Sequence, residues 1–234
     1  MNHIQNKTAI VTGASRGIGF SIAKELASLG YWLGIISRNE KDIENASAQI
    51  LKQYPEIKII KGAFDISDCE KAHEFAEKII REFGKVSVLV NNAGEHITGT
   101  SELQIEKLQR MMNTNFITAA CLSQAVIPSM KKDRNGYIFN ISSICGVEAF
   151  PDVGGYVASK FALTGYSDSL AQELEPIGIK VTAICPGWVN TRMANDSPLK
   201  PEDMIQPEDI AKTVRYLLEI GKTAYIRKIV IHSK

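Results

Sequence analysis

The chain has 234 residues, of which 44% are hydrophobic and 23% charged, and its formal net charge is +1. These values are close to the averages of soluble globular domains, so the disordered, collagen-like and disulfide-scaffold classes are excluded. The balanced charge also excludes the basic excess that nucleic-acid binding and broad attraction to anionic membranes require. We therefore expect a globular cytoplasmic protein with no nucleic-acid or membrane partner.

The spacing of cysteine and histidine residues favours neither a disulfide framework nor a metal site. The chain has four cysteines that stand far apart, without a C-x-x-C pair: Cys69, Cys121, Cys145 and Cys185. His3, His73 and His232 do not cluster with acids or cysteines at ligand spacing, so we expect reduced thiols and no metal. No apolar stretch has the length of a signal peptide or of a membrane-spanning helix.

Apolar runs of strand length alternate with stretches of helical period along the chain. In chain order, the first half predicts a strand at 8–12, a helix at 18–29, a strand at 31–37, a helix at 40–54 and a strand at 57–64. Next come a helix from a capping box at Ser67 and Glu70 to about residue 83 and a strand at 86–90. The second half predicts a helix that starts at Ser101 and Gln104 and continues through 116–130, then a strand at 137–141, a helix at 156–174, a strand at 180–184, a helix at 207–219 and a strand at 225–231.

This alternation predicts an α/β fold in which a parallel sheet carries helices on both faces. No linker, repeat or low-complexity tract interrupts the pattern, so residues 1–234 are expected to form one doubly wound, Rossmann-type domain with about seven strands. Ligands of such sheets bind at the carboxyl ends of the strands, near the point where strand order reverses. The residues that follow each strand are therefore the candidates for function.

A glycine-rich segment follows the first strand and directly precedes the first helix. It reads Thr12-Gly13-Ala14-Ser15-Arg16-Gly17-Ile18-Gly19. The three glycines allow a tight turn and a close approach to a pyrophosphate, whose charge the helix N-terminus stabilises. Their G-x3-G-x-G spacing is not the standard dinucleotide fingerprint, so a turn glycine with two packing glycines is the alternative.

The end of the second strand indicates which dinucleotide the site prefers. An acid at this place accepts bonds from the adenosine ribose of NAD, but here the strand ends in Ser37-Arg38. Arg38, together with Arg16, is suited to pair with the 2'-phosphate of NADP, unless both are solvated surface charges. Asp65, which ends the third strand, is a candidate for binding adenine or, alternatively, a loop acid.

Residues suited to acid–base chemistry follow the fourth and fifth strands. The small and amide residues at 91–94, NNAG, let the backbone come close to a ligand. Ser143 follows the fifth strand, and Tyr156 and Lys160 form an i, i+4 pair on one helix face. A phenol with a pKa of about 10 is a poor catalyst at neutral pH, but a neighbouring ammonium favours the phenolate and lowers that pKa. A Y-x3-K pair alone is common on helices, and the preceding serine makes it a candidate site.

Taken together, these motifs resemble the short-chain dehydrogenase/reductase family over about residues 7–191. They occur in the family's order: TGASRGIG at 12–19, Asp65, NNAG at 91–94, Asn115, Ser143, Tyr156 with Lys160, and Pro186-Gly187 with Thr191. Each motif alone is weak, and the set is highly specific. The resemblance implies an NADP-preferring oxidoreductase that reduces a ketone or aldehyde, or oxidises the corresponding alcohol.

The resemblance also implies roles for individual residues. Tyr156 would be the acid–base residue, and Ser143 would orient the substrate oxygen. Lys160 would bind the nicotinamide ribose and tune Tyr156, and Asn115 would hold a water in the proton relay. Thr191 would contact the carboxamide of the nicotinamide. The implied cofactor-binding residues are Gly13, Ser15, Arg16, Gly17, Ile18, Gly19, Ser37, Arg38, Asp65, Ile66, Asn92, Ala93, Gly94, Tyr156, Lys160, Pro186, Gly187, Val189 and Thr191.

The substrate and the assembly are less well indicated. A short segment after Thr191 and a last strand without the common glycine-rich ending look similar to carbonyl-reductase and sepiapterin-reductase-like members. A mostly apolar substrate pocket is expected, although His96 also reads as a solvated loop residue and Cys145 as a packing residue. The expected lining residues are His96, Cys145, Phe150, Trp188 and Met193. The apolar helix at 116–130 and the helix after Tyr156 form a dimer contact in the family, which implies a homodimer or homotetramer, unless the first is enclosed within one subunit.

Two other functions compete with carbonyl reduction. One is reduction of a 3-oxoacyl thioester, and the other is a catalytically silent module that senses NADP(H). The presence of Asn115, Ser143, Tyr156 and Lys160 argues against the silent module, because a sensor needs only the phosphate and adenosine end of the site.

Overall fold

The computed structural model describes residues 7–234, so Met1 to Asn6, and with them His3, lie outside the described residues. Within residues 7–234, seven strands form one sheet in the order β3-β2-β1-β4-β5-β6-β7, and every neighbouring pair is parallel. The strands are β1 (Thr8–Thr12), β2 (Trp32–Ser37), β3 (Ile59–Ala63), β4 (Val88–Asn91), β5 (Gly136–Ile141), β6 (Ile179–Pro186) and β7 (Lys228–Ile231). The strand order reverses between β1 and β4, which is where such sheets bind ligands.

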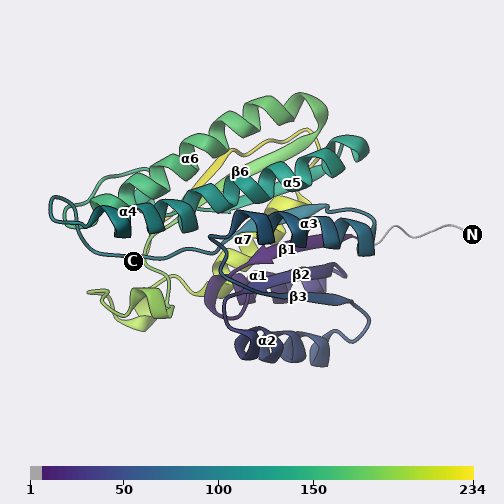
Figure 1. The fold of residues 1–234 in the computed structure, drawn as a ribbon, viewed down its shortest axis with the longest axis horizontal. Coiled ribbons are helices and arrows are strands. Elements are labelled where there is room, and N and C mark those ends of the chain that lie inside the picture. The colour runs from purple at the N-terminus through teal and green to yellow at the C-terminus, as the bar shows by residue number, and fades with distance from the viewer. Residues whose placement is uncertain (1–6) are drawn as a thin grey trace, which may run out of the picture.

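Two layers of helices cover the sheet, and each buries its own hydrophobic core. The helices are α1 (Gly17–Ser28), α2 (Glu40–Gln53), α3 (Cys69–Phe83), α4 (Ile105–Met112), α5 (Thr118–Asp133), α6 (Gly154–Leu174) and α7 (Pro207–Glu219). Side chains of α1, α2 and α7 pack together in one core, and those of α3, α5 and α6 pack in the other. Figure 1 shows α4, α5 and α6 along the top of the view and α2 at the bottom. The predicted doubly wound α/β fold is therefore confirmed.

The strands at the centre of the sheet are apolar because helices cover both of their faces. Every residue of β1, β4 and β5 is buried. A strand covered on both faces cannot alternate apolar and polar residues, and it reads as a continuous apolar run. This is why periodicity located the strand at 8–12 without error, while β7, at the sheet edge, is confined to Lys228–Ile231 and does not reach back to residue 225.

Two of the predicted helix starts are wrong. The capping residue of α3 is Asp68 and not Ser67: the Asp68 side chain accepts a hydrogen bond from the Lys71 backbone N–H at 3.1 Å. Ser67 is not free to cap, because its N–H and hydroxyl both donate to Asp65 Oδ1, at 3.0 and 2.9 Å. An Asp side chain often accepts hydrogen bonds from the residue two positions later, and this local bond competes with the use of that residue as a helix cap.

The helix expected to start at Ser101 and Gln104 begins at Ile105. Ser101 lies in a turn that the Leu103 N–H closes on the Thr100 carbonyl, and the Gln104 side chain makes no capping bond. The helix then continues through a π-helical segment, Asn113–Ile117, into α5, as one continuous rod. A π-helical segment shifts the register of the side chains around the axis, and a pattern of period 3.6 does not reveal it.

The expectation that all four thiols are reduced is also wrong. Cys69, the first residue of α3, is bonded to Cys121 of α5 in a disulfide that spans 52 residues of sequence. Cys145 and Cys185 are free. Sequence spacing did not reveal the pair, because packing of α3 beside α5 brings the two cysteines together.

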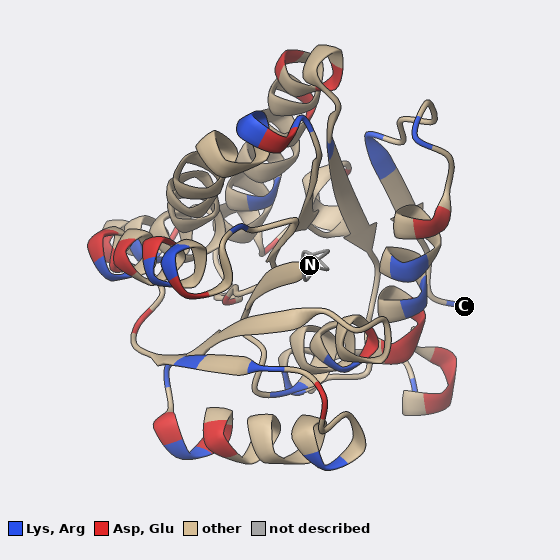
Figure 2. Cartoon of the chain, turned by 90° about the vertical axis from the view of Figure 1, so that its right-hand side faces the viewer, with Lys and Arg blue, Asp and Glu red and all other residues tan. Residues whose placement is uncertain are grey.

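Charged residues of both signs are interspersed along the outer helices, whereas the strands are mostly uncharged (Figure 2). Several form ion pairs between elements, such as Arg215 with Glu25 at 2.8 Å and Lys85 with Asp133 at 3.0 Å. Among the helices of residues 7–234, we find none that combines the length and the apolar character needed to cross a membrane.

Candidate active site

Thr12, the last residue of β1, joins the glycine-rich segment to the residues that follow β4. Its Oγ1 accepts hydrogen bonds from the backbone N–H groups of Asn92 and Ala93, at 2.9 and 2.8 Å. The Asn92 side chain forms a further hydrogen bond with the same residue, since its Nδ2 donates to the Thr12 carbonyl at 2.8 Å. Sequence reasoning missed the role of Thr12, because its hydroxyl gains meaning only through partners 80 residues away.

The glycines of this segment stand at positions where a side chain would not fit. Gly13 and Gly17 have φ angles of +65° and +55°, which side chains rarely adopt. A Cβ on Gly13 would lie 2.8 Å from Asn92 Nδ2, and one on Gly17 would lie 3.1 Å from Thr191 Cγ2. A Cβ on Gly19 would collide with Asn92 Nδ2 and with the Gly13 carbonyl oxygen. The glycines therefore let the backbone pack directly against the NNAG segment and against Thr191.

The N-terminus of α1 opens onto this glycine segment with its N–H groups uncapped by a side chain. Arg16 is the N-cap residue, its side chain makes no capping bond, and the first turn contains no acid. Unpaired N–H groups and the partial positive charge of the helix end favour an anion at this place. The site thus has the features of a phosphate-binding helix terminus.

The cationic candidates lie on the adjoining side, at the ends of β1 and β2. The Ser37 hydroxyl donates to the Ser15 hydroxyl at 3.0 Å, which joins the end of β2 to the glycine segment. Arg16 is exposed and pairs with Asp42 at 3.5 Å. Hydrogen bonds from Ser67 lower the pKa of Asp65, and the charge of Arg38 adds to that shift. Ser15, Arg16, Ser37, Arg38 and Asp65 thus gather at one edge of the sheet.

Ser143, Tyr156 and Lys160 come together from the end of β5 and the first half of α6. All three are buried, with 8%, 8% and 4% of their surface exposed. Lys160 Nζ lies 5.7 Å from the centre of the Tyr156 ring and donates to the Ile141 carbonyl at 2.9 Å. Ser143 lies close enough to Tyr156 to lower the pKa of its hydroxyl, against the effect of burial.

The protonation of this group differs from the expectation that Lys160 lowers the pKa of Tyr156. Burial raises the pKa of Tyr156 above its usual value, and hydrogen bonding to Ser143 opposes that shift. Burial also lowers the pKa of Lys160 to about 8. The physical reason is that desolvation penalises both charged forms, while the Lys160 ammonium is directed to a backbone carbonyl. The Tyr156 hydroxyl therefore keeps its proton at neutral pH.

Asn115 lies in the π-helical segment and is almost completely buried. Its Oδ1 accepts from the Glu95 N–H at 2.8 Å, and its Nδ2 donates to the Glu95 carbonyl and to Ser159 Oγ, both at 2.9 Å. Ser159, a second residue missed from sequence, donates in turn to the Tyr156 carbonyl at 2.7 Å. The Asn115 side chain thus holds the segment after β4 against α6.

Gly94 separates Asn115 from Lys160. A Cβ on this residue would lie 3.2 Å from Asn115 Oδ1 and 3.6 Å from Lys160 Nζ. The NNAG segment therefore passes between the glycine-rich segment on one side and the Tyr156 group on the other. Ile66 is buried at the start of the loop before α3.

The residues expected to line the substrate pocket divide into two groups. The His96 ring meets the edge of the Tyr156 ring at a centroid distance of 4.9 Å, and the Cys145 N–H donates to Ser143 Oγ at 3.1 Å. Burial lowers the pKa of His96, with Asp196 opposing the shift. Phe150, Trp188 and Met193 are exposed apolar side chains in the segments that follow β5 and β6.

The segment after β6 brings the last predicted residues to the site edge. Pro186 ends β6, and the Gly187 N–H donates to the Ile231 carbonyl at 2.8 Å. Val189 is buried in the core and forms a parallel bridge with Ile205. Within the described residues 7–234, no three His, Cys, Asp or Glu side chains gather in a way that could hold a metal ion.

Comparison with known proteins places this arrangement in a family. Residues 7–202 match the family described as short chain dehydrogenase. A solved betaketoacyl-[ACP] reductase (FabG) from Bacteroides thetaiotaomicron is 39% identical, with a TM-score of 0.87 over 98% of this chain and 97% of that chain. A solved alcohol dehydrogenase from Thermococcus sibiricus, in complex with 5-hydroxy-NADP, is 30% identical, with a TM-score of 0.89 over 97% of this chain and 96% of that chain.

A curated relative agrees with these structures. The 3alpha-hydroxysteroid dehydrogenase of Mediterraneibacter gnavus is 34% identical over 225 residues, which are 92% of this chain and 90% of the relative. The family match, these identities and the shared fold all extend over most of the chain. The chain therefore belongs to the short-chain dehydrogenase/reductase family, whose members are oxidoreductases that act on CH–OH or C=O groups.

Proposed function

We propose that this protein is an NADP(H)-dependent oxidoreductase that reduces a ketone or aldehyde, or oxidises the corresponding alcohol. The observation that carries the proposal is the buried group of Ser143, Tyr156 and Lys160 beside the glycine-rich segment. Two hydroxyl groups and an ammonium at the carboxyl ends of the strands match the needs of a carbonyl oxygen that becomes an alkoxide. Because all three side chains are buried together, they favour an active enzyme over a catalytically silent NADP(H)-sensing module.

The site fits a dinucleotide at its other end. The tight turn that Gly13, Gly17 and Gly19 allow against Asn92 and Thr191 leads into the uncapped N-terminus of α1, which suits a pyrophosphate. Arg16 and Arg38 suit a 2'-phosphate, and Asp65 with Ile66 suits the adenine. Solved relatives that contain an NADP-type ligand support the choice of NADP(H).

When bound, the cofactor supplies or accepts a hydride. The residues of this chain handle the oxygen and the proton. Ser143 and Tyr156 donate hydrogen bonds to the substrate oxygen, and Tyr156 releases its proton to that oxygen as negative charge develops. The Tyr156 hydroxyl is protonated at neutral pH, and since burial raises its pKa, its proton is released only as negative charge develops on the substrate oxygen. The Lys160 ammonium, 5.7 Å from the ring, stabilises the phenolate that remains.

The direct test is Tyr156→Phe, which removes the hydroxyl and keeps the buried ring. We expect reduction of a carbonyl substrate to fall by about 10²- to 10⁴-fold, the usual contribution of a general acid. NADPH binding, measured by cofactor fluorescence, should stay close to that of the wild type. Normal turnover by this variant would contradict the proposal.

A second candidate is reduction of a 3-oxoacyl thioester, which is favoured by the 39% identity to the solved reductase from Bacteroides thetaiotaomicron. An NADPH-oxidation screen against ketones, aldehydes, quinones and 3-oxoacyl thioesters separates the candidates. Tight NADPH binding without oxidation of any of these would favour the sensing module instead. The apolar side chains of Phe150, Trp188 and Met193 support a mostly apolar substrate.

The expected homodimer or homotetramer has support in two exposed apolar side chains. Ile117, in the π-helical segment, and Phe161, on α6, are 39% and 43% exposed. An exposed apolar face on neighbouring helices is typical of a surface that a second subunit covers. The expectations of a single domain over 1–234 and of a cytoplasmic location stay predictions.

A further inference from the structure

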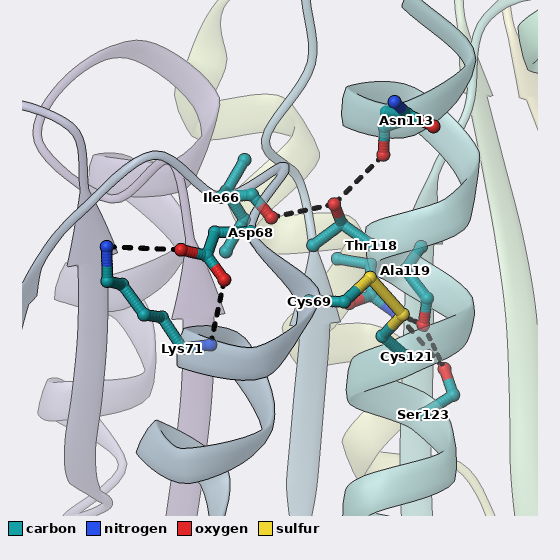
Figure 3. Close-up of a disulfide and its surroundings, with 10 residues drawn as sticks. Ile66, Asp68, Cys69, Lys71, Asn113, Thr118, Ala119, Cys121 and Ser123 are labelled. Carbon is teal, nitrogen blue, oxygen red and sulfur yellow. Dashed lines mark hydrogen bonds and ion pairs between the residues drawn. A yellow bond between two sulfur atoms is a disulfide. The ribbon is translucent and has the colours of Figure 1, made fainter. Parts of the chain in front are cut away.

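Cys69 and Cys121 belong to two helices that pack side by side on one face of the sheet. Their Cα atoms are 5.9 Å apart, and their sulfur atoms are bonded (Figure 3). Two thiols at such a separation can bond or part without a large movement of the backbone. Both residues are half-buried and so keep some contact with solvent.

The disulfide stands beside contacts that join the loop before α3 to α5. One turn before Cys121, the Thr118 hydroxyl donates to the Ile66 carbonyl at 2.7 Å (Figure 3). The carbonyl of Ala119 accepts from Asn91 Nδ2 of β4 at 3.3 Å. The disulfide therefore adds a covalent link where the ends of β3 and β4 already meet α5.

These contacts also form the wall of the proposed cofactor site. Ile66, Thr118 and Ala119 line a small cavity together with Thr12, Ala93 and Asn115. Asp65, one residue before Ile66, is the proposed adenine contact. A change at the disulfide thus acts on a loop that directly adjoins the cofactor.

We propose that Cys69 and Cys121 form a reversible redox site that sets the affinity of this protein for NADPH. The effect on affinity rests on the proposed function, whereas the redox chemistry of the pair does not. In reducing compartments protein disulfides form transiently and often act as sensors, which suits a pair that needs no refolding to close.

The oxidant is a disulfide of low molecular mass or of a partner protein. One cysteine thiolate attacks a sulfur of that disulfide, the S–S bond breaks, and the released thiolate takes up a proton. The second cysteine thiolate then attacks the protein sulfur of the mixed disulfide and releases the second thiol. The two cysteines lose two electrons and two protons in total, and the oxidant becomes two thiols.

Cys69 is the better placed of the two to attack first. It is the first residue of α3, where the partial positive charge of the helix end favours a thiolate. The neighbouring Asp68 carboxylate is occupied with Lys71, whose Nζ lies 3.1 Å away. Cys121, on α5, would then resolve the mixed disulfide.

Oxidation and reduction should change cofactor affinity in a defined direction. The disulfide reinforces the contact of the loop at 65–68 with α5, and after reduction the Thr118 bond to Ile66 and the packing of Ile66 in the core remain. A looser loop has to be ordered when the cofactor binds, so the reduced protein should bind NADPH more weakly, by about three- to tenfold. The turnover number should change less, because Tyr156 and Lys160 belong to α6, which neither the disulfide nor the Thr118 bond joins.

The test equilibrates the wild type with mixtures of glutathione and glutathione disulfide over a wide range of ratios. Free thiols are then alkylated, and peptide mapping by mass spectrometry measures the fraction of Cys69–Cys121 crosslink. The Kd for NADPH is measured by fluorescence on the same samples. We expect the crosslink to form and disappear reversibly and the Kd to follow it.

Variants separate the pair from other effects of oxidation. Cys69→Ser and Cys121→Ser should each bind NADPH like the reduced wild type and should not respond to glutathione disulfide. Cys185→Ala removes a cysteine that is free in the structure and should keep the response.

Failure of this proposal is distinct from failure of the proposed function. A crosslink that is absent at every ratio, one that does not reverse, or an equal Kd for crosslinked and reduced protein would each overturn the proposal. If neither form binds NADPH, the proposed function and the effect on affinity fall together, and peptide mapping still decides whether the pair is redox-active.

Discussion

At the scale of single residues, burial shifts the pKa values of the proposed catalytic group. Tyr156 and Lys160 share one face of α6, and burial raises the pKa of the phenol and lowers that of the ammonium to about 8. At pH 7 the phenol is therefore protonated and the ammonium mostly charged. This is the combination that donates a proton to a substrate oxygen and stabilises the phenolate left behind.

The first residue-scale prediction concerns pH. A lysine whose pKa is lowered loses its proton at a lower pH than a solvated lysine, so carbonyl reduction should decline as pH rises through about 8. The measurement is kcat/KM for reduction between about pH 6 and pH 10. His96→Gln should retain this alkaline decline, since the pKa of His96 is shifted in the acid direction. A rate that stays constant up to about pH 10 would contradict the assignment to Lys160.

The second residue-scale prediction concerns the choice of cofactor. Arg38→Ser removes a charge suited to the 2'-phosphate, and a hydrogen bond between charged groups contributes about 1.5–3 kcal/mol. The Kd for NADPH should therefore rise by about 10- to 100-fold, while the Kd for NADH should change little. Lys41→Ser, which removes an exposed cation nearby on α2, is the matched control. Equal weakening of both cofactors in Arg38→Ser would exclude the role of this arginine.

At the scale of elements, the helical period of the sequence located whole helices, whereas the bonds of neighbouring polar side chains decided where a helix starts. Helical period located α7 at Pro207–Glu219, where Gln206 and Asp209 form a capping box. The start of α3 was misjudged because Ser67 binds Asp65, which leaves Asp68 as the cap. A cap is decided by competition among neighbouring polar side chains, and the rank order of capping residues does not resolve that competition.

The element-scale prediction concerns the stability that the link between α3 and α5 provides. A disulfide across 52 residues restricts the unfolded chain, and for such a loop the entropic model gives about 4 kcal/mol. Cys121→Ser should therefore unfold at a lower denaturant concentration than the oxidised wild type. Reduced wild type should unfold like the variant, and indistinguishable oxidised and reduced curves would rule out a stabilising link.

At the scale of the whole molecule, the sheet order brings the segments after β1, β4, β5 and β6 to one edge. Contacts such as Thr12 with Asn92 and Gly17 with Thr191 join segments that are far apart in sequence. Ile117 and Phe161, which are exposed, belong to the same helical segments as Asn115 and Lys160. The helical segments that carry the proposed chemistry thus also carry the residues proposed for self-association.

The whole-molecule prediction concerns that surface. Light scattering should give the wild type at least the mass of a dimer, because association covers the exposed apolar side chains. Phe161→Glu should shift the mass toward that of one chain, since a buried unpaired carboxylate is costly. Lys52→Glu places an acidic residue on α2, on the opposite layer, and should keep the wild-type mass. A wild type with the mass of a single chain would remove the proposed oligomer.

The sequence by itself determined the fold class, the order of the elements and the motifs that carry the family resemblance. These follow from signals that are local in the chain: apolar runs for strands buried on both faces, a period of 3.6 for helices, and glycines where the backbone turns. Part of the candidate site was predictable for the same reason, because the glycine-rich segment, Ser37-Arg38, the NNAG segment and Ser143 follow strands whose carboxyl ends share one edge. Asn115, Tyr156 and Lys160 lie on helices, and the family resemblance was needed to assign their roles.

Only the tertiary structure decided what depends on distances between remote residues. The Cys69–Cys121 bond, the support of the site by Thr12 and Ser159, and the raised pKa of Tyr156 belong to this group. A disulfide requires two helices to pack in one register, and a pKa shift requires the burial that packing creates. Neither quantity is local in the chain, so no reading of its pattern could supply it.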